Sequence, residues 1–442
     1  MKRPNRHFTS SQIIILGFAA AILLGSLLLM LPVSTRDGQG ASFWDALFTS
    51  TSAVCVTGLV VRDTATYWSL FGQAVILTLI QIGGMGVVTL AVAITIISGR
   101  RIGLKQRSTM QEAISAPKVG GIVRLTGFII RMTVLFELAG AAVMAPVFIG
   151  EFGPAKGLWY SVFHAISAFC NAGFDLMGVR SPFSSLTSFA ANPVINIAVM
   201  LLIIIGGIGF TAWDDIRANG LHVHRYRMQS KVVLTSTLLL IALPALYFAF
   251  FEFGGLPACE RLLVSLFQAV TPRTAGFNTA DLTLMSETGL AIVILLMLVG
   301  GSPGSTAGGM KTTTLAVLVS TAVSVFRRKK HTHFFGRRIP DETVRSAATI
   351  LTMYLTLFLA GGCIISRVEG LPLSTCLFET ASAVGTVGLT LGITPQLSLL
   401  SRGILILLMY FGRVGGLTLI FATVSGKACT TARLPEEKLT VG

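Results

Sequence analysis

Long stretches without charge recur along this chain, and their length limits what it can fold into. The first covers residues 13–33 and contains no charged side chain. Crossing the hydrocarbon core of a bilayer takes roughly 20 residues of α-helix. The chain is also 53% hydrophobic and only 12% charged, so it has too few polar residues to cover the surface of a soluble protein. We predict an all-α integral membrane protein.

The start of the chain is compatible with a second interpretation. Lys2, Arg3 and Arg6 precede the first apolar stretch, as basic residues do in a secretory signal peptide. However, residues 13–33 exceed the usual signal-peptide core of about 7–15 residues, and no small-residue cleavage site of the A-x-A kind follows them. We therefore expect this stretch to remain as a membrane span.

The positive charge is unevenly distributed along the chain. The formal net charge is +15, which by itself is compatible with nucleic-acid binding. If the apolar spans alternate in direction, 23 of the 34 Lys and Arg residues fall on one side, in the N-terminus, residues 99–124, 214–231 and 326–345, and the C-terminal tail. Basic loops of membrane proteins face the cytoplasm. The charge therefore predicts that both termini are cytoplasmic, and no nucleic-acid partner is needed to explain it.

Residues that could support enzyme chemistry or a structural metal are scattered. The six cysteines form no C-x-x-C pair and no cluster with histidine, so we predict reduced thiols and no transition-metal site. The apolar stretches offer only isolated acids: Glu112, Glu137 and Glu252. A membrane enzyme needs several such groups close together. We expect no enzyme activity and no covalent cofactor.

Four similar short segments are the main internal pattern of the sequence. They are Leu47–Leu59, Val162–Phe174, Leu266–Phe277 and Leu377–Leu389. Each begins with an apolar residue and Phe, and each ends with Gly followed by Leu or Phe. An apolar run precedes each segment and another, with its own glycine cluster, follows it: Gly83–Gly86, Gly206–Gly209, Gly300–Gly304 and Gly412–Gly416. Repetition of this kind predicts four copies of one structural unit.

The predicted unit is a helix, a short segment and a second helix. This gives eight spans plus four re-entrant pore helices, with one unit each in residues 1–100, 101–218, 219–330 and 331–442. In the third unit the second helix is predicted to be broken at residues 300–314. The glycines at 83–86 and 206–209 have a simpler explanation, because small residues commonly let membrane helices pack closely.

The four short segments indicate a pore. Each is about 12 residues long, too short to span a bilayer. Backbone that leaves a helix at membrane depth must be buried in protein or line a water-filled cavity, and four such turns around one pseudo-fourfold axis meet this condition together. Carbonyl oxygens at a glycine turn can replace the hydration shell of a cation, and the C-terminal ends of the short helices add negative potential. We predict a pore for monovalent cations.

These segments resemble the Trk/Ktr/HKT superfamily of potassium transporters, in which a Thr/Asn-x-Gly-Leu/Phe signature is repeated. The stretch Thr271–Thr279 is the most specific, and the chain looks most like the Ktr-type membrane subunit. The resemblance implies a single-chain version of the tetrameric potassium-channel pore. It implies that K⁺ is held by a selectivity filter formed by Val56, Thr57, Gly58, Asn171, Ala172, Gly173, Thr274, Ala275, Gly276, Thr386, Val387 and Gly388.

The resemblance carries further expectations about ions and partners. Family members with Ser at the position of Gly58 tend towards sodium, so glycine here favours potassium; a sodium or mixed monovalent cation transporter is the alternative, and uptake could depend on Na⁺. The family implies a homodimer in a bacterial inner (cell) membrane, with a cytoplasmic ring of nucleotide-binding regulatory subunits of the RCK type. The resemblance does not extend to the T-V-G-Y-G filter of potassium channels, since only Thr386–Gly388 keeps T-V-G.

A glycine-rich loop and two cations are the gate candidates. The loop consists of Gly300, Gly301, Ser302, Pro303, Gly304, Ser305, Thr306, Ala307, Gly308 and Gly309, a composition that cannot hold a stable helix. Its spacing does not match a Walker A motif. The resemblance makes it a gate beneath the filter. Arg413, and Lys311 just beyond the loop, are predicted either to act as positive barriers to conduction or to tie the structure together.

Overall fold

The computed structural model describes residues 9–89, 107–111, 121–416 and 418. Four long apolar helices dominate it: α1 (Ser10–Leu29), α6 (Ile122–Phe152), α10 (Met228–Tyr247, continued by a π-helical turn to Glu252) and α14 (Asp341–Glu369). Each is long and apolar enough to cross a membrane. Large apolar side chains on their outer faces, such as Leu24 and Leu238, are exposed, as expected for surfaces that contact lipid tails.

A shorter helix follows each long one and packs against it. These helices are α2 (Phe43–Val54), α7 (Pro154–Phe169), α11 (Ala258–Val270) and α15 (Leu373–Gly385). With 12 to 16 residues they are about 18–24 Å long, less than a bilayer core. The phenylalanine that opens each repeated segment is fully buried in all four: Phe48, Phe163, Phe267 and Phe378.

The helices that come next are interrupted at glycine. They are α3 (Leu70–Met85), α8 (Pro193–Gly207), α12 (Glu287–Leu298) and α16 (Leu399–Val414). Helix α3 is followed by Gly86, with a φ angle of 84°. Helix α8 is followed two residues later by Gly209, with a φ angle of 93°, where the chain turns by 95° into α9 (Phe210–Asn219). The sequence predicted a break only in the third unit. Among the described residues four helices have the length of a span, or five with the bent pair.

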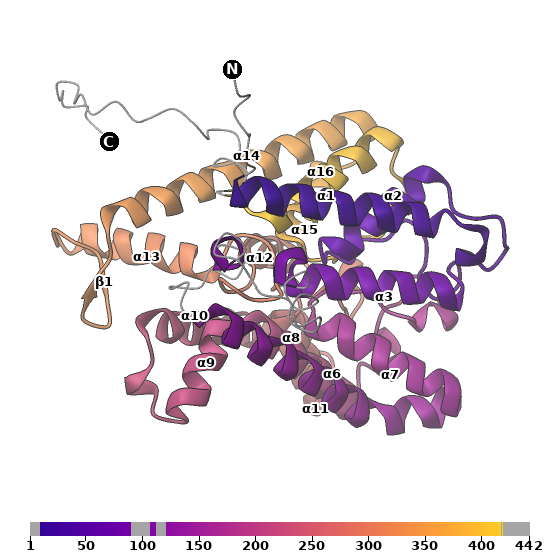
Figure 1. Cartoon of the computed structure of the whole chain (residues 1–442), viewed down its shortest axis with the longest axis horizontal. Coiled ribbons are helices and arrows are strands. Elements are labelled where there is room, and N and C mark those ends of the chain that lie inside the picture. Colours follow the sequence, from indigo (N-terminus) through magenta and orange to yellow (C-terminus); the bar gives the residue numbers. More distant parts are fainter. Residues whose placement is uncertain (1–8, 90–106, 112–120, 417, 419–442) are drawn as a thin grey trace, which may run out of the picture.

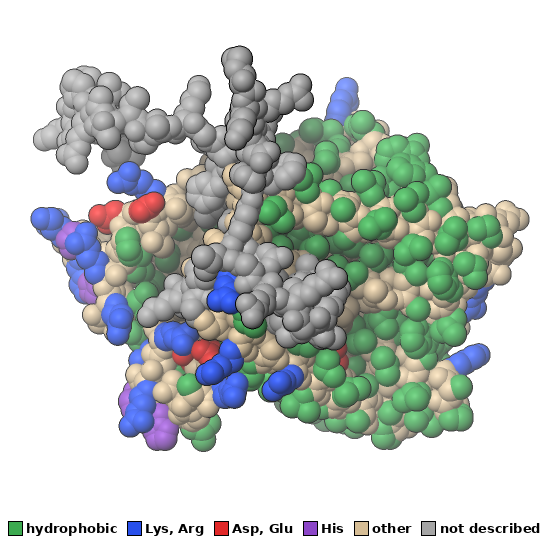
Figure 2. Space-filling view, viewed as in Figure 1, with side chains coloured by type: hydrophobic (Ala, Val, Ile, Leu, Met, Phe, Trp, Pro, Cys, Tyr) green, Lys and Arg blue, Asp and Glu red, His purple; other side chains and the backbone are tan. Residues whose placement is uncertain are grey.

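The broken third unit contains a loop and a small hairpin. After α12 the chain becomes helical again at α13 (Thr312–Phe326), within the predicted break at 300–314. Strands β1 (His333–Phe334) and β2 (Arg337–Arg338) then pair antiparallel before α14. Figure 1 shows this hairpin and α9 at the same end of the molecule, and Figure 2 shows Lys and Arg side chains gathered there. Hydrophobic side chains cover much of the rest of the visible face.

Contacts between the helices follow one rule around the molecule. The helix after each short helix packs against the next short helix along the chain: α3 on α7, α8 on α11, and α12 on α15. Helix α16 then packs on α2, so the last part of the chain closes against the first. The four short helices are therefore brought around a common centre. Their C-terminal ends lead into the candidate site.

Candidate functional site

The chain leaves all four short helices in the same backbone conformation. Residues Val56, Asn171, Thr274 and Thr386 have φ angles of 56°, 59°, 69° and 52°. Only eight non-glycine residues in the described chain have positive φ, and these four are among them. Such conformations cost about 1–3 kcal/mol each and persist where the surrounding structure imposes them, often at functional sites. Two residues later, each of the four segments reaches its glycine, again with positive φ.

The four glycines form a closed circle in chain order. A Cβ atom placed on Gly58 would lie 3.1 Å from the Cα atom of Gly173, and one on Gly173 would lie 2.8 Å from that of Gly276. A Cβ on Gly276 would lie 3.3 Å from the Cα atom of Gly388, and one on Gly388 would lie 3.0 Å from that of Gly58. No side chain fits at these positions, so the backbones meet directly.

Carbonyl oxygens lie in the same circle. At each glycine the atom nearest to an added Cβ is the carbonyl oxygen of the residue before the neighbouring glycine: Ala172, Ala275, Val387 and Thr57. All twelve residues of the predicted filter are buried. The hydroxyls of Thr57 and Thr386 are also buried, and neither has a hydrogen-bond partner in the described chain. The centre therefore gathers backbone and hydroxyl oxygens from four distant segments.

A hydroxyl side chain holds each glycine turn to its own helix. The residues lie four positions after the buried Phe in every copy: Ser52, Ser167, Thr271 and Ser382. Two of them accept a hydrogen bond from the glycine N–H of their segment, at 3.0 Å for both Gly58 and Gly388. The other two donate to the carbonyl of Phe174, at 2.7 Å, and of Phe277. This role was not predicted from the sequence, although the common spacing from Phe signals it.

The residue directly after that Phe fastens the backbone beyond the glycine. His164 Nε2 accepts a hydrogen bond from the N–H of Leu176 at 3.3 Å. The Glu379 carboxylate accepts one from the N–H of Leu391 at 3.1 Å and is fully buried. In the second and fourth segments, hydrogen bonds therefore join the short helix both to the glycine turn and to the backbone that follows it.

The glycine-rich loop, residues 299–311, is held by backbone hydrogen bonds to two other parts of the molecule. The N–H groups of Ser302 and Thr306 donate to carbonyls at the end of α8, at 3.0 and 3.2 Å. The N–H of Gly309 donates to the Gly412 carbonyl on α16 at 3.2 Å. Of the predicted gate residues, those at 300–309 and Lys311 therefore lie in one loop between the second and fourth units, whereas Arg413 lies on α16.

This loop also lies directly against the circle of segments. A Cβ added to Gly300 would lie 3.1 Å from the Thr274 side chain, and one added to Gly308 would collide with the hydroxyl oxygen of Thr386. A Cβ on Gly309 would lie 2.8 Å from the Gly385 carbonyl oxygen. The loop therefore contacts the third and fourth filter segments at their left-handed residues.

Arg413 and Lys311 both donate to backbone carbonyls. The Arg413 guanidinium donates to the carbonyls of Thr306, Gly83 and Gly84, the last at 3.2 Å. It thereby links the loop to α3. The Lys311 ammonium donates to its own loop, at 2.8 Å to Ala307 and 3.2 Å to Gly308. Both side chains line a cavity of about 270 Å³. Both residues thus make hydrogen bonds that join backbone segments, and the positive charge of each also borders this cavity.

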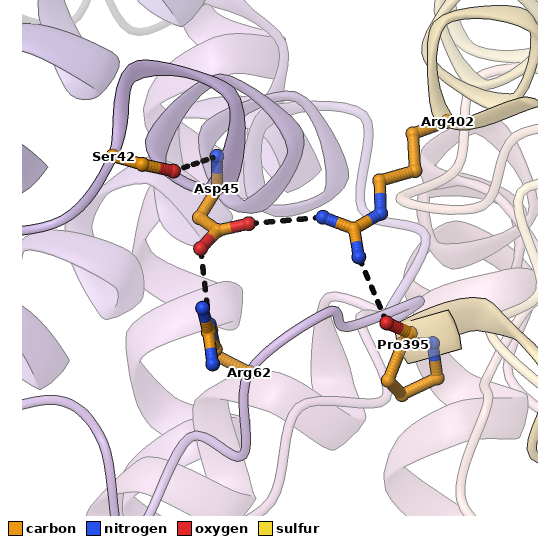
Figure 3. A network of polar contacts seen from close by, with 5 residues as sticks. All are labelled: Ser42, Asp45, Arg62, Pro395 and Arg402. Carbon is orange, nitrogen blue, oxygen red and sulfur yellow. Dashed lines mark hydrogen bonds and ion pairs between the residues drawn. The ribbon is translucent and has the colours of Figure 1, made fainter. Parts of the chain in front are cut away.

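An ion-pair network near the start of α2 joins the first and last parts of the chain. Asp45, near the start of α2, accepts from Arg62 at 3.0 Å and from Arg402 on α16 at 3.1 Å (Figure 3). Arg402 also donates to the Pro395 carbonyl at 2.8 Å. Two arginines compensate the charge of Asp45, and its contact with Arg402 holds α2 against α16.

Comparisons with known proteins agree with this architecture. The family model "TrkH: Cation transport protein" matches residues 2–429. The potassium/sodium uptake protein NtpJ of Enterococcus hirae is 40% identical, and the match covers all of this chain and 99% of that protein. Ktr system potassium uptake protein B is 40% identical in Bacillus subtilis, over 94% of this chain and 93% of that protein. The crystal structure of the potassium transporter TrkH from Vibrio parahaemolyticus superposes with a TM-score of 0.75 at 20% identity, covering 96% of this chain and 86% of that one.

Proposed function

The chain belongs to the TrkH family of cation transport proteins, a family of multi-pass membrane transporters rather than enzymes, and on that premise we propose that it is the membrane subunit of a potassium uptake system. Potassium passes through one central pore lined by the carbonyl oxygens of the four glycine segments. Loss of the hydration shell is compensated by these oxygens, which the protein holds in place. The inside-negative membrane potential drives entry, at about 2.3 kcal/mol per charge for each 100 mV.

One observation carries this proposal: the four glycines meet in a closed circle although they are more than 100 residues apart. Glycines that served only to pack neighbouring helices would have no reason to meet one another. The left-handed residue two positions before each glycine supports the same view. Left-handed and ordinary backbone conformations then alternate along each segment, which turns successive carbonyls towards one side. We accordingly propose four repeats, at residues 1–100, 101–218, 219–330 and 331–442, around a pseudo-fourfold pore.

We further propose that the loop at residues 299–311 closes this pore. It contacts Thr274 and Thr386, and its backbone is fixed to α8 and α16. Arg413 donates to the Thr306 carbonyl of this loop, and its positive charge there repels a cation that leaves the filter. Opening of the pore then requires the loop to break its hydrogen bonds to the carbonyls of α8 and α16.

Sodium or mixed-cation transport is the second candidate. It is favoured by the name of one relative with 40% identity, a potassium/sodium uptake protein. The family resemblance favours potassium, because family members with Ser at the position of Gly58 tend towards sodium. Dependence of potassium uptake on Na⁺ is a separate property, which the same ion-replacement assay measures.

The partners are proposed from the family and the surface. Relatives are named as protein B of the Ktr system, which suggests that further subunits exist. We propose a homodimer, with both termini in the cytoplasm, that docks a ring of RCK-type nucleotide-binding subunits. The exposed cations around the β1–β2 hairpin, such as Arg328 and Arg337, provide a basic surface for an acidic partner.

The experiment that tests the function is rescue of a bacterium that lacks potassium uptake. The wild-type chain is expected to restore growth at low potassium, and each single substitution to Ala at Gly58, Gly173, Gly276 and Gly388 is expected to abolish it at equal protein level in the membrane. Replacement of K⁺ by Na⁺ in the uptake medium distinguishes the two candidate functions. Growth rescue that all four variants retain would overturn the filter assignment.

A further inference from the structure

A groove on the outer side of α6 has no part in the proposed pore. It has a volume of about 800 Å³ and lies between α6, the end of α8, and α9. Its walls are largely apolar and include Phe128 and Trp213. Three arginines also line it: Arg124, Arg131 and Arg217. A site of this size matches those that bind one small organic ligand.

Within the part of the chain that the structure describes, the three arginines have no acidic partner. None of them makes an ion pair or hydrogen bond within the described chain, and all three are exposed. The guanidinium of Arg217 lies over the Phe128 ring, 4.7 Å from its centre. The nearest acids on α9 are already engaged, since Asp214 and Asp215 both pair with Arg227. The groove therefore presents uncompensated positive charge beside an apolar wall.

A second, wholly apolar groove continues the first along α6 and α8. The two grooves share Phe136 and Ile205, and the second has a volume of about 380 Å³. It extends to Val143, which is 52% exposed. From Arg131 to Val143 the helix rises about 18 Å, close to half of a hydrocarbon core about 30 Å thick. Cationic and apolar parts thus follow one another over the depth of one membrane leaflet.

We propose that these grooves bind one anionic phospholipid of the surrounding bilayer. Its phosphate lies among Arg124, Arg131 and Arg217, and an acyl chain lies along the groove between Phe136 and Val143. A free anion would leave the apolar part uncovered, whereas a zwitterionic lipid would leave the arginine charge uncompensated. Basic pockets between membrane helices bind anionic headgroups in this way. The proposal rests on the chain being a membrane protein and does not depend on which cation it transports.

The position of the lipid has a structural consequence. The α8–α9 corner borders the groove, and the N–H of Phe210 at this corner donates to the carbonyl of Gly304 in the 299–311 loop at 2.7 Å. Trp213, in the groove wall, donates to the Ile205 carbonyl across the same corner at 3.0 Å. A bound lipid stabilises this corner, and therefore also the segment to which the loop is fixed.

The test is native mass spectrometry of the purified full chain with added phosphatidylglycerol or phosphatidylcholine. We expect the wild type to retain phosphatidylglycerol in preference. The triple variant Arg124→Gln/Arg131→Gln/Arg217→Gln should bind it about 10- to 100-fold more weakly. The matched control Arg327→Gln/Lys329→Gln/Lys330→Gln removes the same charge from exposed residues near the hairpin and should change binding less than twofold.

A second variant tests the apolar part without altering charge. Gly127 lines the groove, and a Cβ there meets no atom within 4 Å, so Gly127→Phe adds an apolar side chain to the groove from a position that has room for a Cβ. It should weaken phosphatidylglycerol binding by at least about tenfold. Equal retention of both lipids by the wild type, equal loss in the control variant, or full competition by inorganic phosphate would each overturn the proposal. A stable dimer that covers the groove and excludes lipid would also overturn it.

Discussion

At the scale of single residues, the proposed pore depends on positions where only glycine fits. The sequence shows this in part: the four glycines could be found from their repeated context, and the structure places them together. The partners of Arg413 could not be found, because hydrogen bonds to backbone carbonyls over 100 residues away leave no trace in residue type. The hydroxyl residues four positions after Phe were predictable only in part. Their spacing is regular, but serine and threonine are too common in the sequence for that spacing to stand out.

Gly388 and Gly392 provide a matched pair of substitutions. Their φ angles are 95° and 88°, so an added methyl group strains both backbones similarly, by about 1–2 kcal/mol. A Cβ on Gly388 would collide with the Thr57 carbonyl, whereas one on Gly392 meets no atom within 4 Å. We expect Gly388→Ala to reduce potassium uptake velocity by about tenfold or more and Gly392→Ala to leave it within about twofold. Uptake rates per membrane-inserted protein measure this, and equal loss in both variants would assign the effect to strain alone.

Arg413 can be tested with two substitutions that separate its charge from its hydrogen bonds. If the charge obstructs conduction, Arg413→Ala and Arg413→Gln should both raise uptake velocity, by about 3- to 10-fold. If the tie to the Thr306 carbonyl matters more, only Arg413→Ala should do so, because glutamine can still donate. Rubidium flux into proteoliposomes is the measurement. A slower flux at normal protein level would contradict the gating role of this residue.

At the scale of elements, the short helices and the break in the third unit were predictable, whereas the breaks after α3 and α8 were not. The buried Phe and the terminal glycine mark each short helix in the sequence. The glycine clusters that follow contain two kinds of glycine that the sequence does not distinguish. Gly83 lies inside α3 against the Val54 carbonyl, as expected for close packing, whereas Gly86 ends the helix with a φ of 84°. Whether a glycine of such a cluster allows close packing or ends the helix depends on the residues from other parts of the chain that lie against it.

The loop between α12 and α13 yields the prediction at this scale. Deletion of residues 302–305 removes its hydrogen bond to α8 at Ser302 and shortens the segment that lies against Thr386. We expect rubidium flux to rise by several fold, because the obstruction below the filter is removed. Thr306→Val keeps the loop length and removes one bond, to the Phe169 carbonyl, so it should raise flux to a smaller extent. Unchanged flux in both correctly assembled variants would argue against a gate at this position.

At the scale of the whole molecule, the last helices of the chain close against the first, since α16 packs on α2. The sequence predicts four similar units but not their order in space, because nothing in the repeated segments distinguishes one neighbour from another. The order becomes visible in contacts such as that between Asp45 and Arg402, which are 357 residues apart (Figure 3). Closure thus depends on residues outside the repeated pattern.

This closure can be weakened selectively. Arg402→Ala leaves the buried Asp45 carboxylate with only the half-exposed Arg62 as partner. We expect a loss of about 1–3 kcal/mol of stability, seen as a melting temperature several degrees lower in detergent, and partial recovery in Arg402→Lys. Arg367→Ala removes an exposed arginine without an ion pair in the described chain and should change nothing. Equal melting temperatures for Arg402→Ala and the wild type would show that helix packing alone closes the ring.

Diffraction from crystals soaked in rubidium, which replaces potassium and scatters anomalously, tests the central claim most directly. We predict an anomalous peak on the axis of the circle, surrounded by carbonyl oxygens of all four segments, among them those of Thr57, Ala172, Ala275 and Val387. The absence of a peak there, with rubidium bound at one segment or on the outer surface instead, would contradict a shared pore.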